Sequence, residues 1–448
     1  MSELRRRALT GGKTVSRKAR AKPESGLSST NHSPSGSPAT SRVGSRASSR
    51  AGSRYASEDE SAGDSENDDM MTLSAISVDE DDDVDDIWVE RLQDRIAELQ
   101  DRKRSSVRGR EATLAGYNHL LKHHYAQRQL DRHVAELLPV FLRDVKSGTS
   151  SEERLRALKA FTLTVLTCTS ETVFEQAFPV LKAACFDAEE EKNKVEAIYA
   201  LCIAVTYGGG STEAAEEVLD FLLEIIESDG QSVGALDSGP VVTAALEAWA
   251  FVASHLDDLT VQSDAAIEAF MEQLDSSDPD VQTSAGVNIA LLFESARDYE
   301  EQTGESADLQ YNQHRIMTRM AEIVRDSSKT VSKKGRRSLR ANFSSIVTSL
   351  ERGKGPGYST AGWSGPNPHT GGSKSDDYGD FREFGYREKI RIYNQFLLIN
   401  TWSLYARAEM LKTILGGGFV AHYLENQVIR DILSDAEVEF IGNNSLRK

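Results

Sequence analysis

A series of amphipathic helical stripes between Glu152 and Tyr207 limits the possible folds more than any other feature of the chain. Apolar residues recur there every three or four positions, which is the spacing of one face of an α-helix. The first stripe runs from Leu155 to Leu166, the second from Val173 to Cys185 and the third from Val195 to Val205. Such helices cannot bury an apolar face alone, so they must stack on neighbouring helices.

Similar helix starts return downstream and indicate a repeat. They fall near Glu152, Glu191, Pro240 and Pro279, roughly 40–48 residues apart, which is typical of HEAT and armadillo units. The start at Asp278-Pro279 is the clearest, because aspartate caps a helix and proline fits its first turn. In the second stripe, Pro179 suits a first turn or a kink better than a helix middle. We therefore predict an all-α, HEAT/armadillo-like α-solenoid with a disordered N-terminal region.

The first 86 residues have a composition that favours disorder. They contain few aromatic residues and many Ser, Gly, Arg and then Asp and Glu, so they cannot bury enough apolar surface to offset the entropy of ordering. The whole chain has 448 residues and a net charge of -18. The segment from Glu58 to Asp86 contains no Lys or Arg and supplies most of this negative charge. Two basic clusters near the start are spaced like a bipartite nuclear localisation signal, or form a merely solvated tail. These candidate nuclear-targeting residues are Arg5, Arg6, Arg7, Arg17, Lys18, Arg20 and Lys22.

Several kinds of function are disfavoured by the sequence. No secretory leader and no apolar run of roughly 18 residues is present, so we expect an intracellular, soluble protein without a membrane partner. The cysteines sit on helix stripes and suit buried, reduced thiols. His119 and His123 have a spacing compatible with metal, but no third ligand is visible. Without a nucleophile–base pair, metal cluster or phosphate loop, we expect no enzyme activity, no cofactor and no small-molecule substrate.

Basic residues return in two places and are the candidate contacts for nucleic acid or the ribosome. The stretch from Lys329 to Arg340 holds six cations on an otherwise acidic chain, and it leads into an apolar helical stripe. Such cations can neutralise phosphates, each adding a salt-dependent term to binding. The alternative is a solvated helix face. The candidate residues are Lys333, Lys334, Arg336, Arg337 and Arg340, together with Arg102, Lys103, Arg104 and Arg108.

These features divide the chain into five segments. Residues 1–86 form the tail just described, and residues 87–352 form the helical repeat domain. Residues 353–379 are a flexible Gly/Pro/Ser linker. Residues 380–433 are expected to be a C-terminal helical block that packs on the solenoid, and residues 434–448 a second tail.

Three stretches resemble the interferon-related developmental regulator family. The first is Arg104-Ser105-Ser106 with Arg108-Gly109-Arg110, and the second is Lys333-Lys334 with Arg336-Arg337. The third and most specific lies between Trp402 and Ile432, where a tryptophan is followed by a glycine run, a histidine and a Glu-Asn pair. The resemblance covers roughly Arg102 to Leu433. Its structural motif residues in this chain are Trp402, Gly416, Gly418, His422 and Asn426.

The resemblance implies a non-enzymatic regulator found in the nucleus and the cytoplasm. Family members are transcriptional co-regulators, or bind ribosomes and repress translation. The chain is similar to a fungal-type member and is expected to lack the basic C-terminal extension of animal members. We therefore expect a regulatory scaffold that binds ribosome or RNA through its basic helices, and regulatory proteins through a concave surface. The alternative is a nuclear co-regulator that recruits chromatin-modifying complexes. An armadillo-type transport adaptor ranks lower, because Trp249 is the only tryptophan within the repeats.

Overall fold

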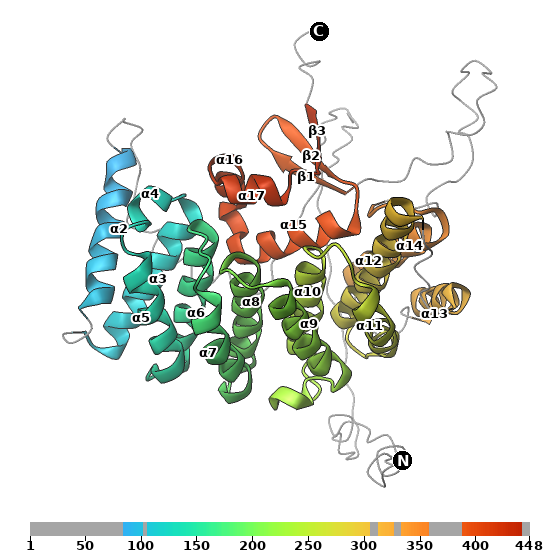
Figure 1. Cartoon of the computed structure of the whole chain (residues 1–448), viewed down its shortest axis with the longest axis horizontal. Helices are drawn as coiled ribbons and strands as arrows, with labels where there is room; N and C mark the ends of the chain where they lie inside the picture. The colour runs from blue at the N-terminus through green and yellow to red at the C-terminus, as the bar shows by residue number, and fades with distance from the viewer. Residues whose placement is uncertain (1–83, 102–104, 305–311, 327–332, 358–387, 441–448) are drawn as a thin grey trace, which may run out of the picture. The chain divides into compact units, whose positions relative to one another are not determined.

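Helices packed in consecutive pairs make up most of the structure (Figure 1). The computed structural model describes residues 84–101, 105–304, 312–326, 333–357 and 388–440. All of these belong to the second of two units, Asp79–Lys448. The first helices of the pairs are α2 (Val84–Gln100), α5 (Val134–Ser147), α7 (Phe174–Asp187), α9 (Thr212–Glu227), α11 (Thr260–Gln273) and α13 (Gln313–Asp326). Their partners are α3 (Val107–His123), α6 (Ser151–Thr167), α8 (Glu191–Tyr207), α10 (Gly239–Ala253), α12 (Pro279–Thr303) and α14 (Lys333–Arg352).

The second helices of the pairs also pack on one another and form an inner layer. The contacts run in order from α3 to α6, α8, α10, α12 and α14. Helices α8 and α10 of this layer are buried on nearly all sides, which is typical of a helix that is apolar around its circumference. The outer helices α5 and α9 are amphipathic and bury one face only. The short helix α4 (Gln127–Leu130) joins the first pair to the second, and η4 (Gln231–Val233) joins α9 to α10 within one pair.

The all-α, solenoid-like fold class predicted from the sequence is confirmed. The predicted helix starts near Glu152, Glu191, Pro240 and Pro279 correspond to α6, α8, α10 and α12, which are successive helices of the inner layer. The repeat predicted from the sequence therefore corresponds to the distance along the chain between successive helices of the inner layer. The three cysteines are free and buried in this core, as expected.

Side-chain caps explain where two of the inner helices begin. The Ser150 hydroxyl accepts a hydrogen bond from the Glu153 amide at 3.0 Å. At α12, the Asp278 carboxylate accepts from the Asp280 amide at 2.8 Å, and Pro279 occupies a position whose missing N–H costs no helical bond. Each cap pairs an amide that a helix leaves without an internal partner.

Two local predictions were wrong. Pro179 lies inside α7 rather than in its first turn, because the helix already begins at Phe174. The loop before α7 is held by the end of α8, where Tyr207 and Gly208 accept backbone hydrogen bonds from Ser170 and Phe174 at 3.0 and 2.8 Å. Order also begins earlier than predicted, since residues 84–86 already belong to α2. The rest of the predicted N-terminal tail, and most of the predicted linker, lie outside the described residues.

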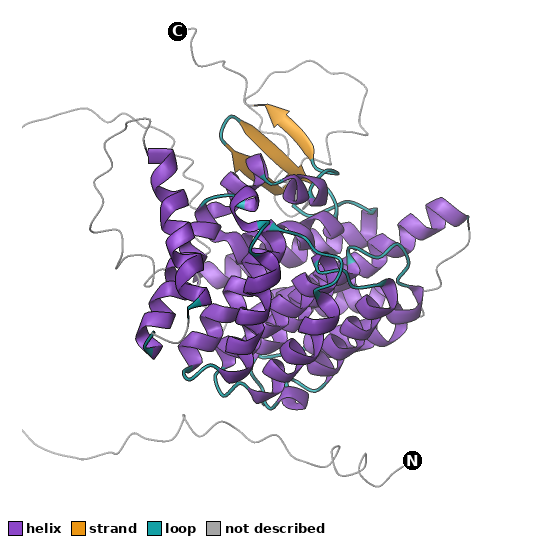
Figure 2. Ribbon diagram, turned by 60° about the vertical axis from the view of Figure 1, so that its left-hand side comes forward, coloured by secondary structure: helices purple, strands orange, loops and turns teal. Residues whose placement is uncertain are grey.

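The C-terminal part is not wholly helical, which corrects the predicted block at 380–433 and the tail at 434–448. Strands β1 (Glu388–Ile392), β2 (Gln395–Ile399) and β3 (Glu437–Phe440) form an antiparallel sheet in the order β1-β2-β3 (Figure 2). The reason is that Lys389 to Ile392 alternate between basic and apolar residues, a two-residue turn follows, and Phe396 to Ile399 form a short apolar run. In that turn Tyr393 has a φ of 47°, the left-handed conformation that such turns require.

In the sequence, strands β2 and β3 are separated by three helices and a short 3₁₀ turn. These are α15 (Trp402–Leu415), η5 (Gly416–Gly418), α16 (Phe419–Glu425) and α17 (Gln427–Ile432). We call α15 to α17, with η5, the C-terminal segment. Within it, α15 lies across α6, α10 and α12, while η5 and α16 contact α3 (Figure 1). The segment therefore crosses the inner layer from one end towards the other.

A buried lysine joins three backbone segments of the solenoid. The Lys194 ammonium donates to the carbonyl oxygens of Cys185, Phe186 and Val233 at 3.0, 2.9 and 2.7 Å. Only 4% of Lys194 is exposed. The first two carbonyl groups lie in the last turn of α7, and the third belongs to η4. The ammonium therefore supplies a donor to carbonyl groups that have no partner within their own helix.

We expect Lys194→Met to lower the free energy of unfolding by about 1–3 kcal/mol, because it leaves buried carbonyl groups without a donor. Lys192→Met is the matched control, since Lys192 lies on the same helix and is exposed. Denaturant titration of both variants checks this. Equal losses for the two variants would contradict the assigned role of Lys194.

Candidate interaction surfaces

The basic cluster predicted at Lys333 to Arg340 opens helix α14. Lys333, Lys334, Arg336 and Arg337 lie on its first turns, and their side chains lie outside the described part. Arg340 is exposed. The second half of the helix is anchored: Phe343 and Ile346 are fully buried, and both approach Gly286 of α12. The cations therefore belong to a helix whose far half is fixed in the core.

The second basic group lies around the start of α3. Arg102, Lys103 and Arg104 fall outside the described residues, and Arg108 is exposed on the first turn. Ser106 caps this helix by accepting from the Gly109 amide at 3.1 Å. Because α3 packs on α6 and α14 packs on α12, Arg108 and the basic start of α14 lie at opposite ends of the inner layer. The structure does not bring them together.

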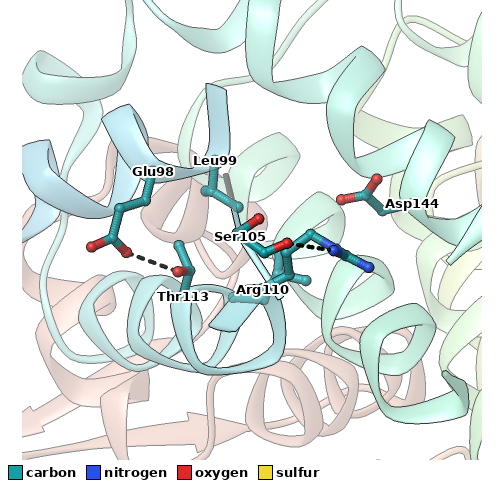
Figure 3. Close-up of a pocket in the computed structure, with 7 residues that line it drawn as sticks. Glu98, Leu99, Ser105, Arg110, Thr113 and Asp144 are labelled. Atoms are coloured by element: carbon teal, nitrogen blue, oxygen red, sulfur yellow. Dashed lines mark hydrogen bonds between the residues drawn. The ribbon is translucent and has the colours of Figure 1, made fainter. Parts of the chain in front are cut away.

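One arginine near this site is committed to an internal contact. Arg110 binds the fully buried carboxylate of Glu153 with two hydrogen bonds, at 2.6 and 3.1 Å. It also donates to the Ser105 carbonyl at 3.1 Å, beside a hollow lined by Asp144 (Figure 3). The hollow encloses about 10 Å³, room for roughly one water molecule. Arg110 is thus a structural residue, and the hollow has no room for a substrate.

The motif residues His422 and Asn426 bind the ends of inner-layer helices. His422 Nε2 donates to the Leu121 carbonyl at 2.8 Å, near the end of α3. Burial lowers the pKa of His422 and so favours its neutral form. Asn426 donates to the Leu166 carbonyl at 3.1 Å, near the end of α6, while its own oxygen accepts from the Val428 amide at 2.9 Å. Both side chains are fully buried.

A third inner helix is held in the same way. The Arg407 guanidinium of α15 donates to the carbonyl of Ser254, the residue that ends α10. It also lies 3.7 Å from the Asp435 carboxylate. The neighbouring His255 accepts from or donates to the Tyr207 hydroxyl at 2.8 Å, and burial lowers the pKa of His255 to about 4. A cation at a helix C-terminus is favoured by the helix dipole.

The start of α15 is fixed by a buried carboxylate that no sequence pattern indicated. Glu294 of α12 accepts from the backbone amides of Trp402 and Ser403 at 2.8 and 2.9 Å. The Trp402 indole then donates to the Ser349 hydroxyl of α14 at 2.7 Å. Helices α12, α14 and α15 are therefore joined at one point. Burial raises the pKa of Glu294 to about 7, although the two amides act in the opposite direction.

The glycine run has a steric reason. A Cβ atom on Gly418 would lie 1.6 Å from the Lys122 carbonyl oxygen, so only glycine allows η5 to approach the end of α3. Gly416 ends α15 with a φ of 50°, where side chains with a Cβ atom are strained. The motif shared by Trp402, the glycines, His422 and Asn426 therefore describes the attachment of the C-terminal segment.

The described residues were expected to hold neither a metal site nor a membrane span. Among them, no cluster of His, Cys, Asp or Glu could hold a metal ion. His119 and His123 contact each other, with ring centres 4.6 Å apart. Within these same ranges, no helix combines the length and hydropathy needed to cross a bilayer.

Comparison with known proteins identifies a family and several relatives. A family model described as interferon-related developmental regulator (IFRD) matches residues 48–351. A Schizosaccharomyces pombe protein, named only as uncharacterised, is 26% identical over 364 residues, covering 77% of this chain and 74% of its own. Interferon-related developmental regulator 2 of Mus musculus is 25% identical over 307 residues, covering 66% of this chain and 57% of its own. Interferon-related developmental regulator 1 of Sus scrofa is 23% identical over 349 residues, covering 73% and 68%.

Asn426→Ala should lower the free energy of unfolding by about 1–3 kcal/mol. It removes the donor to the buried Leu166 carbonyl and the cap of α17. The adjacent Gln427 is exposed, so Gln427→Ala is expected to change stability by no more than about 0.5 kcal/mol. Guanidinium denaturation of the two variants provides the comparison. If both are as stable as the parent chain, Asn426 does not hold the segment.

Glu294 should make stability depend on pH. Between pH 4.5 and about 7 its folded form keeps a proton that the unfolded chain has released. Its stabilising contribution is therefore complete below pH 4.5 and is lost as the pH rises towards 7, a change of up to about 3 kcal/mol. We expect Glu294→Gln to flatten the pH profile of the unfolding free energy across this window.

Glu268→Gln is the control for this titration, because Glu268 is exposed on α11. Its profile should run parallel to that of the parent chain. A Glu294→Gln profile with the parent slope would show that this carboxyl titrates at its ordinary pKa.

Proposed function

Because the chain belongs to the interferon-related developmental regulator family, we propose that it is a non-enzymatic regulatory scaffold that binds the ribosome or RNA and represses translation. Two of the relatives named above, from Mus musculus and Sus scrofa, are regulators by name. A helical solenoid with no metal cluster among its described residues suits a binding role better than a chemical one. We also propose that it acts in the cytoplasm and the nucleus.

The observation that carries this proposal is the construction of α14. Its basic first turns continue directly into a half that is buried against α12. A charged group on a fixed helix loses less conformational freedom on binding than one on a free tail. Arg340, which is exposed on this helix, extends the cationic stretch. The exposed Arg108 on α3 supplies a second, separate contact for a long polyanion.

The C-terminal segment restricts where a protein partner could bind. A concave surface on the inner layer was expected from the sequence, but the ends of α3, α6 and α10 are already bound by this segment. We therefore propose that partners use the basic ends of the inner layer rather than the face beneath α15.

The test is salt-dependent cosedimentation with purified eukaryotic ribosomes. Replacing Lys333, Lys334, Arg336 and Arg337 by Ala should weaken binding. It should also reduce the slope of log K against log salt concentration by about 3, if each cation contacts one phosphate.

The control replaces four exposed cations elsewhere, Arg128, Arg132, Lys146 and Lys192, by Ala. This variant carries the same change in net charge and should retain the parent slope. Equal weakening of the two variants would mean that binding follows net charge only. No cosedimentation of the parent chain at low salt would reject the ribosome as a partner.

The alternative function is a nuclear co-regulator that recruits chromatin-modifying complexes. It is favoured by the basic clusters Arg5–Arg7 and Arg17–Lys22, which have the spacing of a nuclear localisation signal. Affinity purification with and without nuclease separates the two proposals. Ribosomal proteins that are lost on nuclease treatment support the first, whereas nuclease-resistant chromatin proteins support the second.

A further inference from the structure

The three-stranded sheet has one apolar face, which continues onto its last strand. Leu397 of β2 is paired with Ile390 of β1 on one side and with Val438 of β3 on the other. Gln395 is likewise opposite Phe440. Residues directly opposite each other on neighbouring strands point to the same face of a sheet. Val438 and Phe440 therefore extend the face that Ile390 and Leu397 begin.

This face is covered over β1 and β2 but open over β3. Ile390 and Leu397 are 7% and 0% exposed, whereas Val438 and Phe440 are 43% and 76% exposed. Two apolar side chains thus stand in solvent at the edge of a face that is otherwise buried. An isolated exposed apolar residue needs no explanation, but these two continue a packed surface.

The opposite face of the sheet has basic residues on β1, apolar residues on β2 and acidic residues on β3. Glu437 and Glu439 project from β3 on this side, and Lys389 projects from β1. The Lys389 ammonium passes over the Phe396 ring, 5.5 Å from its centre, and meets the Glu439 carboxylate at 2.5 Å. The Glu439 carboxylate of β3 is therefore within reach of a basic side chain that comes from another strand.

Within the described ranges, β3 pairs only with β2, so its outer backbone N–H and C=O groups are open to a further strand. We propose that β3 binds an extended peptide segment of a partner protein in which basic and apolar residues alternate. The peptide adds to the sheet as a new edge strand. Its basic side chains face Glu437 and Glu439, and its apolar side chains cover Val438 and Phe440.

The sheet itself supports this choice of occupant. Strand β1, with Lys389, Ile390, Arg391 and Ile392 in succession, has the alternation that the partner needs. A nucleic acid is disfavoured at this edge, because the two carboxylates repel phosphate. The site is separate from the basic start of α14, so it goes beyond the ribosome or RNA contact proposed above.

The experiment uses the full chain and two blocked, fluorescent octapeptides, one of alternating Lys and Val and one of alternating Glu and Val. Fluorescence anisotropy should detect binding of the basic peptide only. Glu437→Lys should weaken that binding about tenfold and should increase affinity for the acidic peptide. Glu268→Lys gives the same change in net charge on the exposed face of α11 and should leave both affinities unchanged.

The apolar side is tested in the same way. Phe440→Ser should weaken binding of the basic peptide, whereas Val261→Ser, at an exposed apolar residue on α11, should not. All these positions are exposed, so unchanged thermal unfolding of each variant serves as the folding check. The proposal is overturned if the basic peptide does not bind, or if Glu437→Lys and Glu268→Lys weaken binding equally.

Discussion

The backbone carbonyl groups at the C-terminal ends of the inner-layer helices set the main constraint on this structure. A helix leaves its last four carbonyl groups without internal partners, and burying them unpaired costs free energy. Here the C-terminal segment supplies the donors: His422 for α3, Asn426 for α6 and Arg407 for α10. The segment is therefore part of the solenoid's hydrogen bonding. Its own helix α15 depends in turn on Glu294 of α12.

This arrangement places the proposed interaction sites at the margins of a body whose inner helices are joined by the C-terminal segment. The layer that a solenoid usually offers to partners has the ends of its helices bound by its own chain. Basic residues at the starts of α3 and α14 remain at the two ends of the row, and β3 remains at the open edge of the small sheet. A long, charged partner such as RNA suits sites that are separated in this way, because each contact adds to the total without any deep pocket.

The sequence correctly predicted those helices and caps that local residue patterns determine. The apolar stripes identified α6, α8, α10 and α12, and the cap Asp278 was visible as a residue type at a helix start. The strands β1 and β2 were missed because each has five residues and their turn, Tyr393-Asn394, is not a common hairpin signal. The role of the C-terminal motif was also hidden. His422 and Leu121 are 301 residues apart, and no local periodicity reveals which distant carbonyl a buried histidine meets. Likewise, the salt bridge between Arg110 and Glu153 forms only because α3 packs on α6, which the sequence does not reveal.

The central claim is that α15 to α17 and the inner-layer helices form one cooperative unit, and native-state hydrogen exchange tests it most directly. The account predicts that the amides of α15, α16 and α17 open with the same free energy and the same denaturant dependence as those at the C-terminal ends of α6 and α10. Exchange of the C-terminal segment through a separate opening of lower free energy, with the α6 and α10 amides still protected, would contradict it.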